Sequence, residues 1–530
     1  MVKIASQQAA VLQVIGSAAT YGLPNQIIER IDTHASTVFL IGDYAYKIKK
    51  DVKYPFLDFS SLEKRRLALV NELRLNRRTA PQIYLDLIPV TSTEGGDIFL
   101  RSTGKIIEWV LRMHRFDQDR LYDRMAVEGR LPLAAMPRLA AKIAELHRGA
   151  DRTLTPEQAV LPLVRIIEDN LAAFAGRDEI VPADVQAQLG ERSRSALAAL
   201  MPWLEARARG GFVRQCHGDL HLRNIVEIEG EPVLFDALEF DDRLATIDVL
   251  YDLAFLLMDL GARGLVDHAN AVLNAYLETS GDTANLIGLK TLPLFLSMRA
   301  MIRAKVELLR SEQGPKQNRD EARARAHGYF LLARDYLEIR APRLISIGGL
   351  SGSGKSTVAR MLAPRIGSFP GAVHIRSDAE RKRMFGVPFD AKLPPSAYAL
   401  EVTELVYAAC GKRAALALEG GQTAIVDAVQ AREEERQALA VLAAKIGVAF
   451  TGIWLEVPRM TLRQRVSTRK GDVSDATPEI VDQQLAFDLG RQNFAVVDAS
   501  KPLEQVIQAC LDKIGEQAAR TWQRRLAPGG

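Results

Sequence analysis

The sequence of 530 residues predicts an α+β front half followed by an α/β rear half with a parallel sheet. Three observations predict this order. Strand-like runs open the front half and long helical segments follow them, whereas short β-rich runs alternate with helical segments in the rear half. A polar turn at 311–319 lies between the halves. Because alternating strands and helices are typical of a parallel sheet covered by helices, we expect such a sheet in the rear half.

Composition and charge exclude several classes of protein. Hydrophobic residues make up 48% of the chain and charged residues 25%, which is typical of globular domains and not of disordered chains. The net charge of +4 gives no general reason to expect binding to nucleic acids or membranes. The three cysteines are widely spaced, which fits a reducing compartment. We recognise no signal peptide and no membrane-length apolar run, and therefore expect a cytoplasmic protein, with its oligomeric state left open.

The front half is predicted to begin with a β-hairpin. The turn Gly42-Asp43 joins two strand-like runs, and a helix and three further strand-like runs follow. Helical periodicity dominates from about residue 121 to residue 206. The predicted strands are 37–41, 44–49, 84–90, 97–101 and 105–113, and the predicted helix is 62–77.

The first set of reactive side chains lies in the middle of the front half. The stretch His217-Gly218-Asp219 is followed by Asn224, and Asp236 comes after a short predicted hairpin. An aspartate, an asparagine and a second aspartate form the set that phosphoryl transfer to a hydroxyl requires. Asp219 is predicted to orient the acceptor and take its proton. The oxygens of Asn224 and Asp236 are predicted to bind Mg²⁺.

At these residues the chain resembles the aminoglycoside phosphotransferase and choline kinase group, relatives of protein kinases. The resemblance covers about residues 30–310. It implies an α+β bilobal protein-kinase-like domain over residues 1–340. The small lobe would span about 25–112 and the helical large lobe about 113–340.

The same resemblance implies a strand lysine that clamps the phosphates and a helix glutamate that orients it. Lys47 and Glu72 match these positions in the ATP site, and Lys49 on the same strand face is a rival for Lys47. Segment 108–113 would be the hinge whose backbone reads the adenine. No GxGxxG loop precedes Lys47, so catalytic activity of the front domain stays open.

Supporting roles follow from the resemblance for four further residues. His217 would brace the catalytic loop, and Glu239 would assist at the metal. Asp248 and Asp252 match acidic positions that brace the catalytic loop in this group, and a structural role is the preferred interpretation for both.

The rear domain, predicted over 341–530, opens with the most specific motif in the chain, which we call the phosphate loop. It follows the strand-like run 344–347 and precedes a helical pattern. Its glycines let backbone N–H groups point at a phosphate, its lysine reaches the β- and γ-phosphates, and its last serine binds Mg²⁺. The motif predicts a P-loop NTPase domain that uses ATP and Mg²⁺. The residues predicted to bind ATP are Gly349, Leu350, Ser351, Gly352, Ser353, Gly354, Lys355, Ser356 and Thr357.

Further strand-like runs at 373–375, 423–426, 448–457 and 494–497 complete the predicted parallel sheet. Asp378 follows the first of these runs and could activate an acceptor hydroxyl, with Arg381 and Arg383 binding an anionic acceptor. An N-cap aspartate that opens a basic surface helix is the alternative for Asp378. Asp427 ends the next strand and is predicted to bind the metal together with Ser356.

Arginines ahead of the polar loop 471–475 suit a lid that closes over ATP. Arg463, Arg465 and Arg469 lie in this stretch, and the last two are predicted to bind ATP. A solvated charged face is the alternative. These rear residues resemble the small P-loop kinases that include polynucleotide 5′-hydroxyl kinases, zeta toxins and gluconate kinases, over about 343–514.

The whole order resembles bacterial proteins described as bifunctional aminoglycoside phosphotransferase family and ATP-binding proteins. It predicts an ATP-dependent kinase with two Mg²⁺–ATP sites that transfer the γ-phosphate to hydroxyl groups of small-molecule acceptors. The catalytic residues would be Asp219, Asp378, Lys47 and Lys355. The alternative is a front domain that senses a nucleotide or metabolite and controls a rear kinase acting on nucleic-acid ends or nucleotide-sugar-like acceptors. Nucleic acid is not the favoured partner, no membrane contact is expected, and both acceptors stay open.

Overall fold

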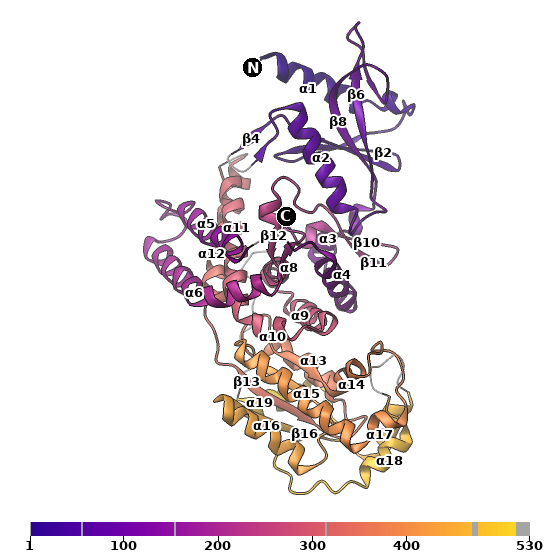
Figure 1. The fold of residues 1–530 in the computed structure, drawn as a ribbon, viewed down its shortest axis with the longest axis vertical. Helices are drawn as coiled ribbons and strands as arrows, with labels where there is room; N and C mark the ends of the chain where they lie inside the picture. The colour runs from indigo at the N-terminus through magenta and orange to yellow at the C-terminus, as the bar shows by residue number, and fades with distance from the viewer. Residues whose placement is uncertain (1, 55–56, 153–154, 313–314, 469–474, 516–530) are drawn as a thin grey trace. The chain divides into compact units, whose positions relative to one another are not determined.

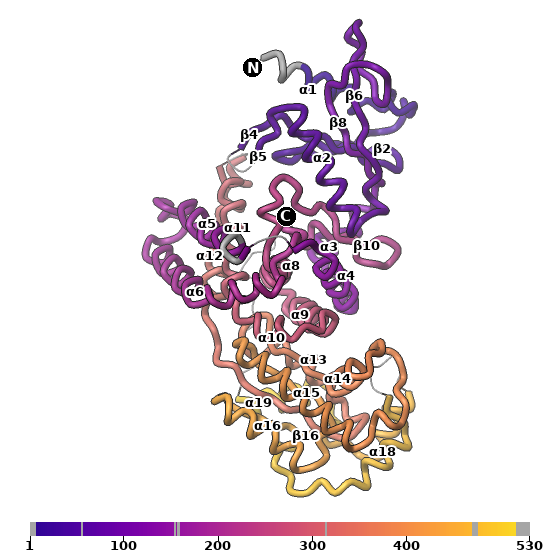
Figure 2. Tube along the Cα trace, viewed as in Figure 1, coloured from indigo at the N-terminus to yellow at the C-terminus, as the bar shows by residue number. Residues whose placement is uncertain are grey.

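The computed structural model describes residues 2–54, 57–152, 155–312, 315–468 and 475–515, and Figure 2 draws the other residues in grey. The chain forms two compact units. Unit 1 comprises Met1–Leu154 and Gly211–Asp252, and unit 2 comprises Thr155–Gly210 and Leu253–Gly530. None of the described helices combines the length and the apolar character needed to cross a membrane.

Unit 1 is built around a six-stranded antiparallel sheet in the order β1-β2-β3-β8-β6-β7 (Figure 1). The predicted hairpin and the three later strands are all present. The strands are β1 (Glu29–Asp32), β2 (Ser36–Ile41), β3 (Tyr44–Lys49), β6 (Tyr84–Ser92), β7 (Ile98–Leu100) and β8 (Lys105–His114), and a separate ribbon contains β4 (Lys53–Tyr54) and β5 (Leu57–Asp58). The segment 108–113, predicted to be a hinge, lies inside β8, because it pairs with both neighbouring strands.

Helices cover both faces of this sheet. Phe39 and other residues of one face pack with α1 (Val2–Ile15), and Leu40 and other residues of the opposite face pack with α2 (Leu62–Asn76). Because side chains alternate along a strand, the odd-numbered residues 45, 47 and 49 of β3 lie on the face that α2 covers. Ser61 caps α2 by accepting a hydrogen bond from the N–H of Lys64.

Two short ribbons of unit 1 frame the loops that carry the reactive side chains. Strand β9 (Val213–Gln215) pairs with β12 (Thr246–Asp248), and β10 (Ile225–Ile228) pairs with β11 (Glu231–Leu234). The remaining α-helices of this unit are α3 (Tyr122–Val127), α4 (Met136–Gly149) and α7 (Asp242–Ala245).

Unit 2 contains the later part of the predicted helical stretch and the rear domain. Helix α5 packs with α6, and α11 packs along α12. The helices before the rear sheet are α5 (Pro156–Ala172), α6 (Ala183–Arg209), α8 (Val249–Ala262, whose first residues belong to unit 1), α9 (Val266–Ser280), α10 (Thr283–Gly288), α11 (Leu292–Arg310) and α12 (Lys316–Tyr336).

The rear sheet is parallel and has five strands, as predicted, and the structure shows that their order is β14-β15-β13-β16-β17 (Figure 1). Helices α15 and α16 pack on one face, and α13 and α19 pack on the other. The strands are β13 (Arg343–Gly348), β14 (Val373–Arg376), β15 (Ala424–Asp427), β16 (Ala449–Glu456) and β17 (Ala495–Asp498). The helices are α13 (Lys355–Leu362), α14 (Ser377–Met384), α15 (Leu400–Glu419), α16 (Glu433–Ile446), α17 (Arg459–Ser467), α18 (Pro478–Leu485) and α19 (Leu503–Ile514). Parallel strands bring their carboxyl ends, and the loops that follow them, to one edge of the sheet.

Candidate active sites

The loop between β9 and β10 places Asp219 and Asn224 side by side. The Asn224 Nδ2 donates to the backbone oxygen of Asp219 (2.9 Å) and to its carboxylate Oδ2 (3.0 Å). Asn224 is buried, whereas the carboxylate of Asp219 is 40% exposed. The asparagine therefore orients the carboxylate, and part of the Asp219 side chain stays accessible to solvent.

Asp252, in the first turn of α8, holds this loop from behind. Its Oδ1 accepts from the N–H of Gly218 (2.9 Å), and its Oδ2 accepts from the N–H of His217 (3.2 Å) and lies 3.0 Å from His147 Nε2. Gly218 has a φ of 82°, a left-handed conformation that favours glycine. His217 Nε2 lies 3.0 Å from the backbone oxygen of Phe235, so the same loop is also tied to the segment that carries the second aspartate.

Replacing Asp252 with alanine is expected to destabilise the protein by about 3 kcal/mol, because two buried backbone N–H groups would lose their acceptor. Urea unfolding of the full chain measures the effect, with the exposed Asp97→Ala as the matched control. Equal unfolding midpoints for the two variants would show that Asp252 does not stabilise the loop.

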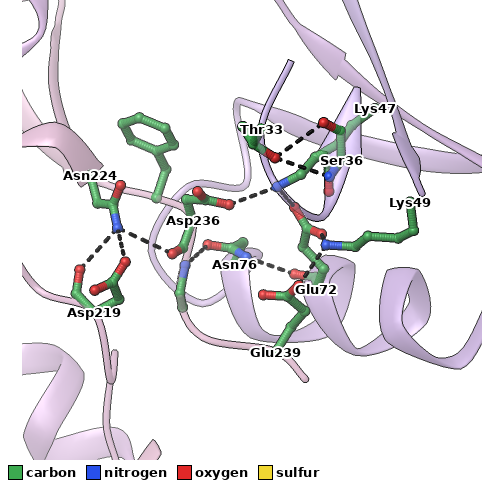
Figure 3. A network of polar contacts seen from close by, with 12 residues as sticks. Thr33, Ser36, Lys47, Lys49, Glu72, Asn76, Asp219, Asn224, Asp236 and Glu239 are labelled. Atoms are coloured by element: carbon green, nitrogen blue, oxygen red, sulfur yellow. Dashed lines mark hydrogen bonds and ion pairs between the residues drawn. The ribbon is translucent and has the colours of Figure 1, made fainter. Parts of the chain in front are cut away.

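Two lysines of β3 meet Glu72 of α2 in unit 1 (Figure 3). Lys47 Nζ lies 2.7 Å from Glu72 Oε1 and 2.8 Å from Asp236 Oδ1. Lys49 Nζ lies 2.7 Å from Glu72 Oε2 and 2.5 Å from Glu239 Oε1. Glu72 thus bridges both lysines, while Lys47 contacts the aspartate predicted to bind metal and Lys49 contacts the neighbouring glutamate.

The acidic side chains keep both lysines charged. Burial alone would lower the pKa of Lys47, but the charges of Asp236 and Glu72 outweigh burial and raise this pKa well above its ordinary value. Burial also opposes the charge of Lys49, whose pKa is raised by Glu239 and Glu72. Burial would raise the pKa of Asp236, but the charge and hydrogen bond of Lys47 lower it. At neutral pH the site therefore presents two ammonium groups and an ionised Asp236.

The backbone around Asp236 is fixed by three side chains that the sequence alone did not indicate. Tyr84 Oη accepts from the N–H of Asp236 (3.1 Å), and Asn76 Oδ1 accepts from the N–H of the next residue (2.9 Å). Asn71 Nδ2 donates to the backbone oxygen of Glu239 (2.6 Å). Asp236 has a φ of 58°, which is uncommon for a residue with a side chain and persists where surrounding contacts determine it.

The oxygen donors of the front site fit Mg²⁺. The carboxylate of Asp236 is 41% exposed, and the Asn224 amide lies beside this residue, with Nδ2 3.5 Å from its backbone oxygen. Carboxylate and amide oxygens are the hard ligands that Mg²⁺ prefers. Glu239, expected to assist at the metal, is paired with Lys49, as Asp236 is with Lys47.

The phosphate loop connects β13 to α13 and has the conformation that its glycines predict. Gly349 and Gly352 have φ values of 140° and 86°, and a Cβ on them would lie 2.8 and 2.7 Å from backbone oxygens. Lys355 begins α13 and its Nζ donates to Leu350 O (3.1 Å). The buried Ser353 Oγ has no hydrogen-bond partner within the described residues, and a phosphate group would supply one. The loop and the helix N-terminus together have the geometry of an anion cradle.

Asp427, at the carboxyl end of β15, meets His374 of β14 and Ser356 of the phosphate loop. The His374 Nε2 lies 3.2 Å from Asp427 Oδ2, and Asn274 Oδ1 of α9 accepts from the His374 N–H (2.7 Å). Burial would raise the pKa of Asp427, but the hydrogen bond and charge of His374, the charge of Lys355 and a hydrogen bond from Ser356 lower it to about 2. An ionised carboxylate beside a hydroxyl fits Mg²⁺.

Asp378 lies in the first turn of α14, partly exposed, and the two arginines of the same helix have partners within the protein. Arg381 is buried and donates to Ala397 O (2.5 Å) and to Thr403 Oγ1 (3.3 Å). Arg383 forms an ion pair inside the helix. Contact of either guanidinium with an acceptor would therefore require an exchange of partners.

Arg465 of α17 lies beside the phosphate loop. A Cβ on Gly354 would be 3.9 Å from Arg465 Nη1, and the Nη2 of this arginine donates to a backbone oxygen (3.1 Å). Arg463 is ion-paired with Asp482 of α18. Arg469, also predicted to bind ATP, lies outside the described residues.

Sequence reasoning missed Asp475 and His374. Asp475 accepts from the N–H of Leu393 (3.1 Å) and from Tyr398 Oη (2.7 Å), and pairs with the buried Lys382 (3.3 Å). It thus holds together the segment between α14 and α15, beside the predicted acceptor residues. In the sequence, Asp475 is an aspartate in the expected lid loop and His374 is a histidine on a strand before Asp378. Neither position indicates which residues these side chains contact.

Comparison with known proteins shows similarity to two families and to full-length relatives. The model of the phosphotransferase enzyme family matches residues 62–287, and the model of an AAA domain matches residues 344–488. Over 489 residues the chain is 30% identical to uncharacterized proteins of Mycobacterium tuberculosis and Mycobacterium bovis, which covers 90% of this chain and 93% of each relative. The first family match includes Asp219, Asn224 and Asp236, and the second includes the phosphate loop.

Two solved structures are also similar. A choline/ethanolamine kinase family protein from Mesorhizobium loti has 19% sequence identity and a TM-score of 0.40, over 62% of this chain and 95% of that one. A gluconokinase from Sinorhizobium meliloti 1021 has 24% identity and a TM-score of 0.25, over 33% of this chain and 93% of that one.

Proposed function

We propose that this chain, which belongs to the family of its mycobacterial relatives and is an ATP-dependent phosphotransferase, has two Mg²⁺–ATP sites. Its phosphotransferase domain precedes an AAA-type P-loop domain. Each site transfers the γ-phosphate to a hydroxyl group of a small-molecule acceptor. The first activity belongs to residues 1–340 and the second to 341–530. The observation that carries the proposal is that Lys47 joins Glu72 and Asp236 in one ion-paired cluster, in a chain that also has a phosphate loop.

At the front site Asp219 accepts the proton of the acceptor hydroxyl as the oxygen attacks the γ-phosphate. Asn224 orients the carboxylate of Asp219, whose side chain is 40% exposed. Lys47 binds phosphate oxygens, and Glu72 holds the lysine in place. Asn224 and Asp236 would hold Mg²⁺, which would neutralise charge on the phosphates.

At the rear site Lys355 and the backbone of the phosphate loop bind the ATP phosphates. Ser356 and Asp427 would hold Mg²⁺, and Asp378 takes the proton of the second acceptor. Arg465, beside Gly354, offers positive charge to the transferred group. The three cysteines, all buried free thiols, support the proposal of a cytoplasmic location.

Labelled ATP tests the proposal directly. The full chain, Lys355→Met, Asp219→Asn and the double variant are each incubated with Mg²⁺, γ-labelled ATP and a metabolite extract. Two labelled products are expected, one absent with each single variant and both absent with the double variant. A single labelled product that one substitution removes and the other leaves unchanged would contradict the two-site proposal. Labelled product from the double variant would contradict the assignment of Lys355 and Asp219 to the two sites.

Lys47 and Lys49 are expected to differ in what their loss affects. Lys47→Met should lower front-site transfer about 100-fold or more, because it removes the cation that binds the phosphates. Lys49→Met should chiefly destabilise the protein, by about 3 kcal/mol, because the Lys49 side chain is only 2% exposed and its loss breaks the buried ion pair with Glu239.

The two lysine variants are compared in a Lys355→Met background, so that the front site alone is measured. Transfer of label and urea unfolding are recorded for both. The opposite result, with lost transfer for Lys49→Met and lost stability for Lys47→Met, would assign the phosphate clamp to Lys49.

A further inference from the structure

A glutamine from helix α18 contacts the phosphate loop. The N–H of Ser351 donates to Gln484 Oε1 at 2.8 Å, across 133 residues of sequence. Backbone N–H groups of such a loop are donors for phosphate oxygens. The carboxamide oxygen of Gln484 is therefore bonded to one of the groups that form the anion cradle.

The position of Gln484 is set by the packing of α17 and α18. Val466 of α17 and Val481 of α18 belong to the same buried core as β13. Asp482, two residues before Gln484, forms ion pairs with Arg459 (3.0 Å) and Arg463 of α17. These contacts fix α18 next to the helix that carries Arg465, so Gln484 reaches the loop from a packed element.

The contact lies at the end of the loop where we expect the terminal phosphate of ATP to bind. Lys355, the residue that reaches β- and γ-phosphates, has its Nζ 3.1 Å from Leu350 O, and Leu350 immediately precedes Ser351. The ammonium group and the Gln484 carboxamide thus both contact the stretch 350–351. The α13 N-terminus, where the β-phosphate is bound, begins at Lys355.

A primary carboxamide has one acceptor oxygen and two N–H donors. When the oxygen is bonded to the loop, the NH₂ group remains available to donate to an oxygen of a bound phosphate. We propose that Gln484 binds the γ-phosphate at the rear site and makes this site prefer ATP to ADP. This inference rests on the proposed rear ATP site and assigns it a residue from outside the motif.

Nucleotide binding to the full chain tests the inference. Calorimetric titrations with Mg²⁺ and either a non-hydrolysable ATP analogue or ADP are compared for the wild type, Gln484→Leu and Gln484→Glu. The rear-site signal is the part that Lys355→Met removes. Gln484→Leu is expected to weaken binding of the ATP analogue about tenfold, which is the effect of one lost hydrogen bond to a charged group, and to change ADP binding less than twofold.

Gln484→Glu should weaken binding of the ATP analogue at least as much, because a carboxylate repels the γ-phosphate. The exposed neighbour Gln483→Leu is the matched control and should change neither affinity. Equal weakening of both nucleotides, no weakening, or tighter binding would overturn the assignment of Gln484. If Lys355→Met removes no nucleotide binding, the proposed rear ATP site itself is wrong, which is a separate result.

Discussion

Lys355→Met is expected to lower phosphoryl transfer at the rear site by about 10²- to 10³-fold, the usual effect of losing one preorganised charged or hydrogen-bonding group at a reacting centre. The lysine begins α13, directly after the glycine turn, and its Nζ lies against the backbone of the phosphate loop. An ammonium group in this position neutralises charge on the β- and γ-phosphates as the phosphoryl group leaves. Methionine keeps most of the volume of the side chain and removes this charge.

Transfer of label from ATP measures this effect in the full chain. Lys445→Met, at an exposed lysine of α16, is the control for loss of a positive charge. The fold should be unaffected to within about 1 kcal/mol, because one hydrogen bond to Leu350 O is lost. A variant that folds normally and retains full rear-site transfer would show that the phosphate loop does not serve catalysis.

Asp219→Asn is expected to lower front-site transfer by about 10²- to 10⁴-fold, the range that general-base catalysis contributes. The amide has nearly the same shape as the carboxylate and can keep a hydrogen bond to Asn224, but it cannot accept the acceptor proton. The affinity for ATP should be almost unchanged, because Lys47, Glu72 and Asp236 are untouched. The substitution should therefore lower kcat and leave KM for ATP within about twofold.

The control for this variant is Asp97→Asn, at an exposed aspartate of unit 1. Steady-state transfer of label in a Lys355→Met background isolates the front site. Loss of ATP binding with unchanged turnover of the bound fraction would place Asp219 in nucleotide binding and contradict its role as the base.

The two lysines of β3 show how far sequence reasoning could reach in the front site. Strand periodicity placed Lys47 and Lys49 on one face but could not choose between them. The fold separates them, because Lys47 meets Asp236 and Lys49 meets Glu239. This distinction depends on the position of the segment after β11 against α2. Asn76 and Asn71 of α2 fix that position through hydrogen bonds to the backbone of the segment. No local sequence pattern predicts where this segment packs.

The two arginines of α14 show that residue type and position in the sequence do not predict which groups a side chain contacts. Arg381 and Arg383 are predicted to bind an anionic acceptor because of their charge and their place after β14. In the structure, both guanidinium groups contact other groups of the protein. The same run of basic residues is compatible with side chains that face an acceptor and with side chains that face the protein interior. Burial of Arg381 follows from the packing of the segment at 397–403 over α14, which sequence spacing does not reveal.

Features that depend on neighbouring residues could be predicted from the amino-acid sequence. The alternation of strands and helices predicted the parallel sheet, and the phosphate loop and the His217-Gly218-Asp219 stretch were recognised because their chemistry requires residues a few positions apart. The distant side chains that complete the two sites became known from the folded structure. Gln484 at the phosphate loop, His374 at Asp427 and Lys47 at Asp236 are joined across 133, 53 and 189 residues of sequence. Such contacts form when whole strands and helices pack, so their geometry is a property of the assembled core and not of any short stretch.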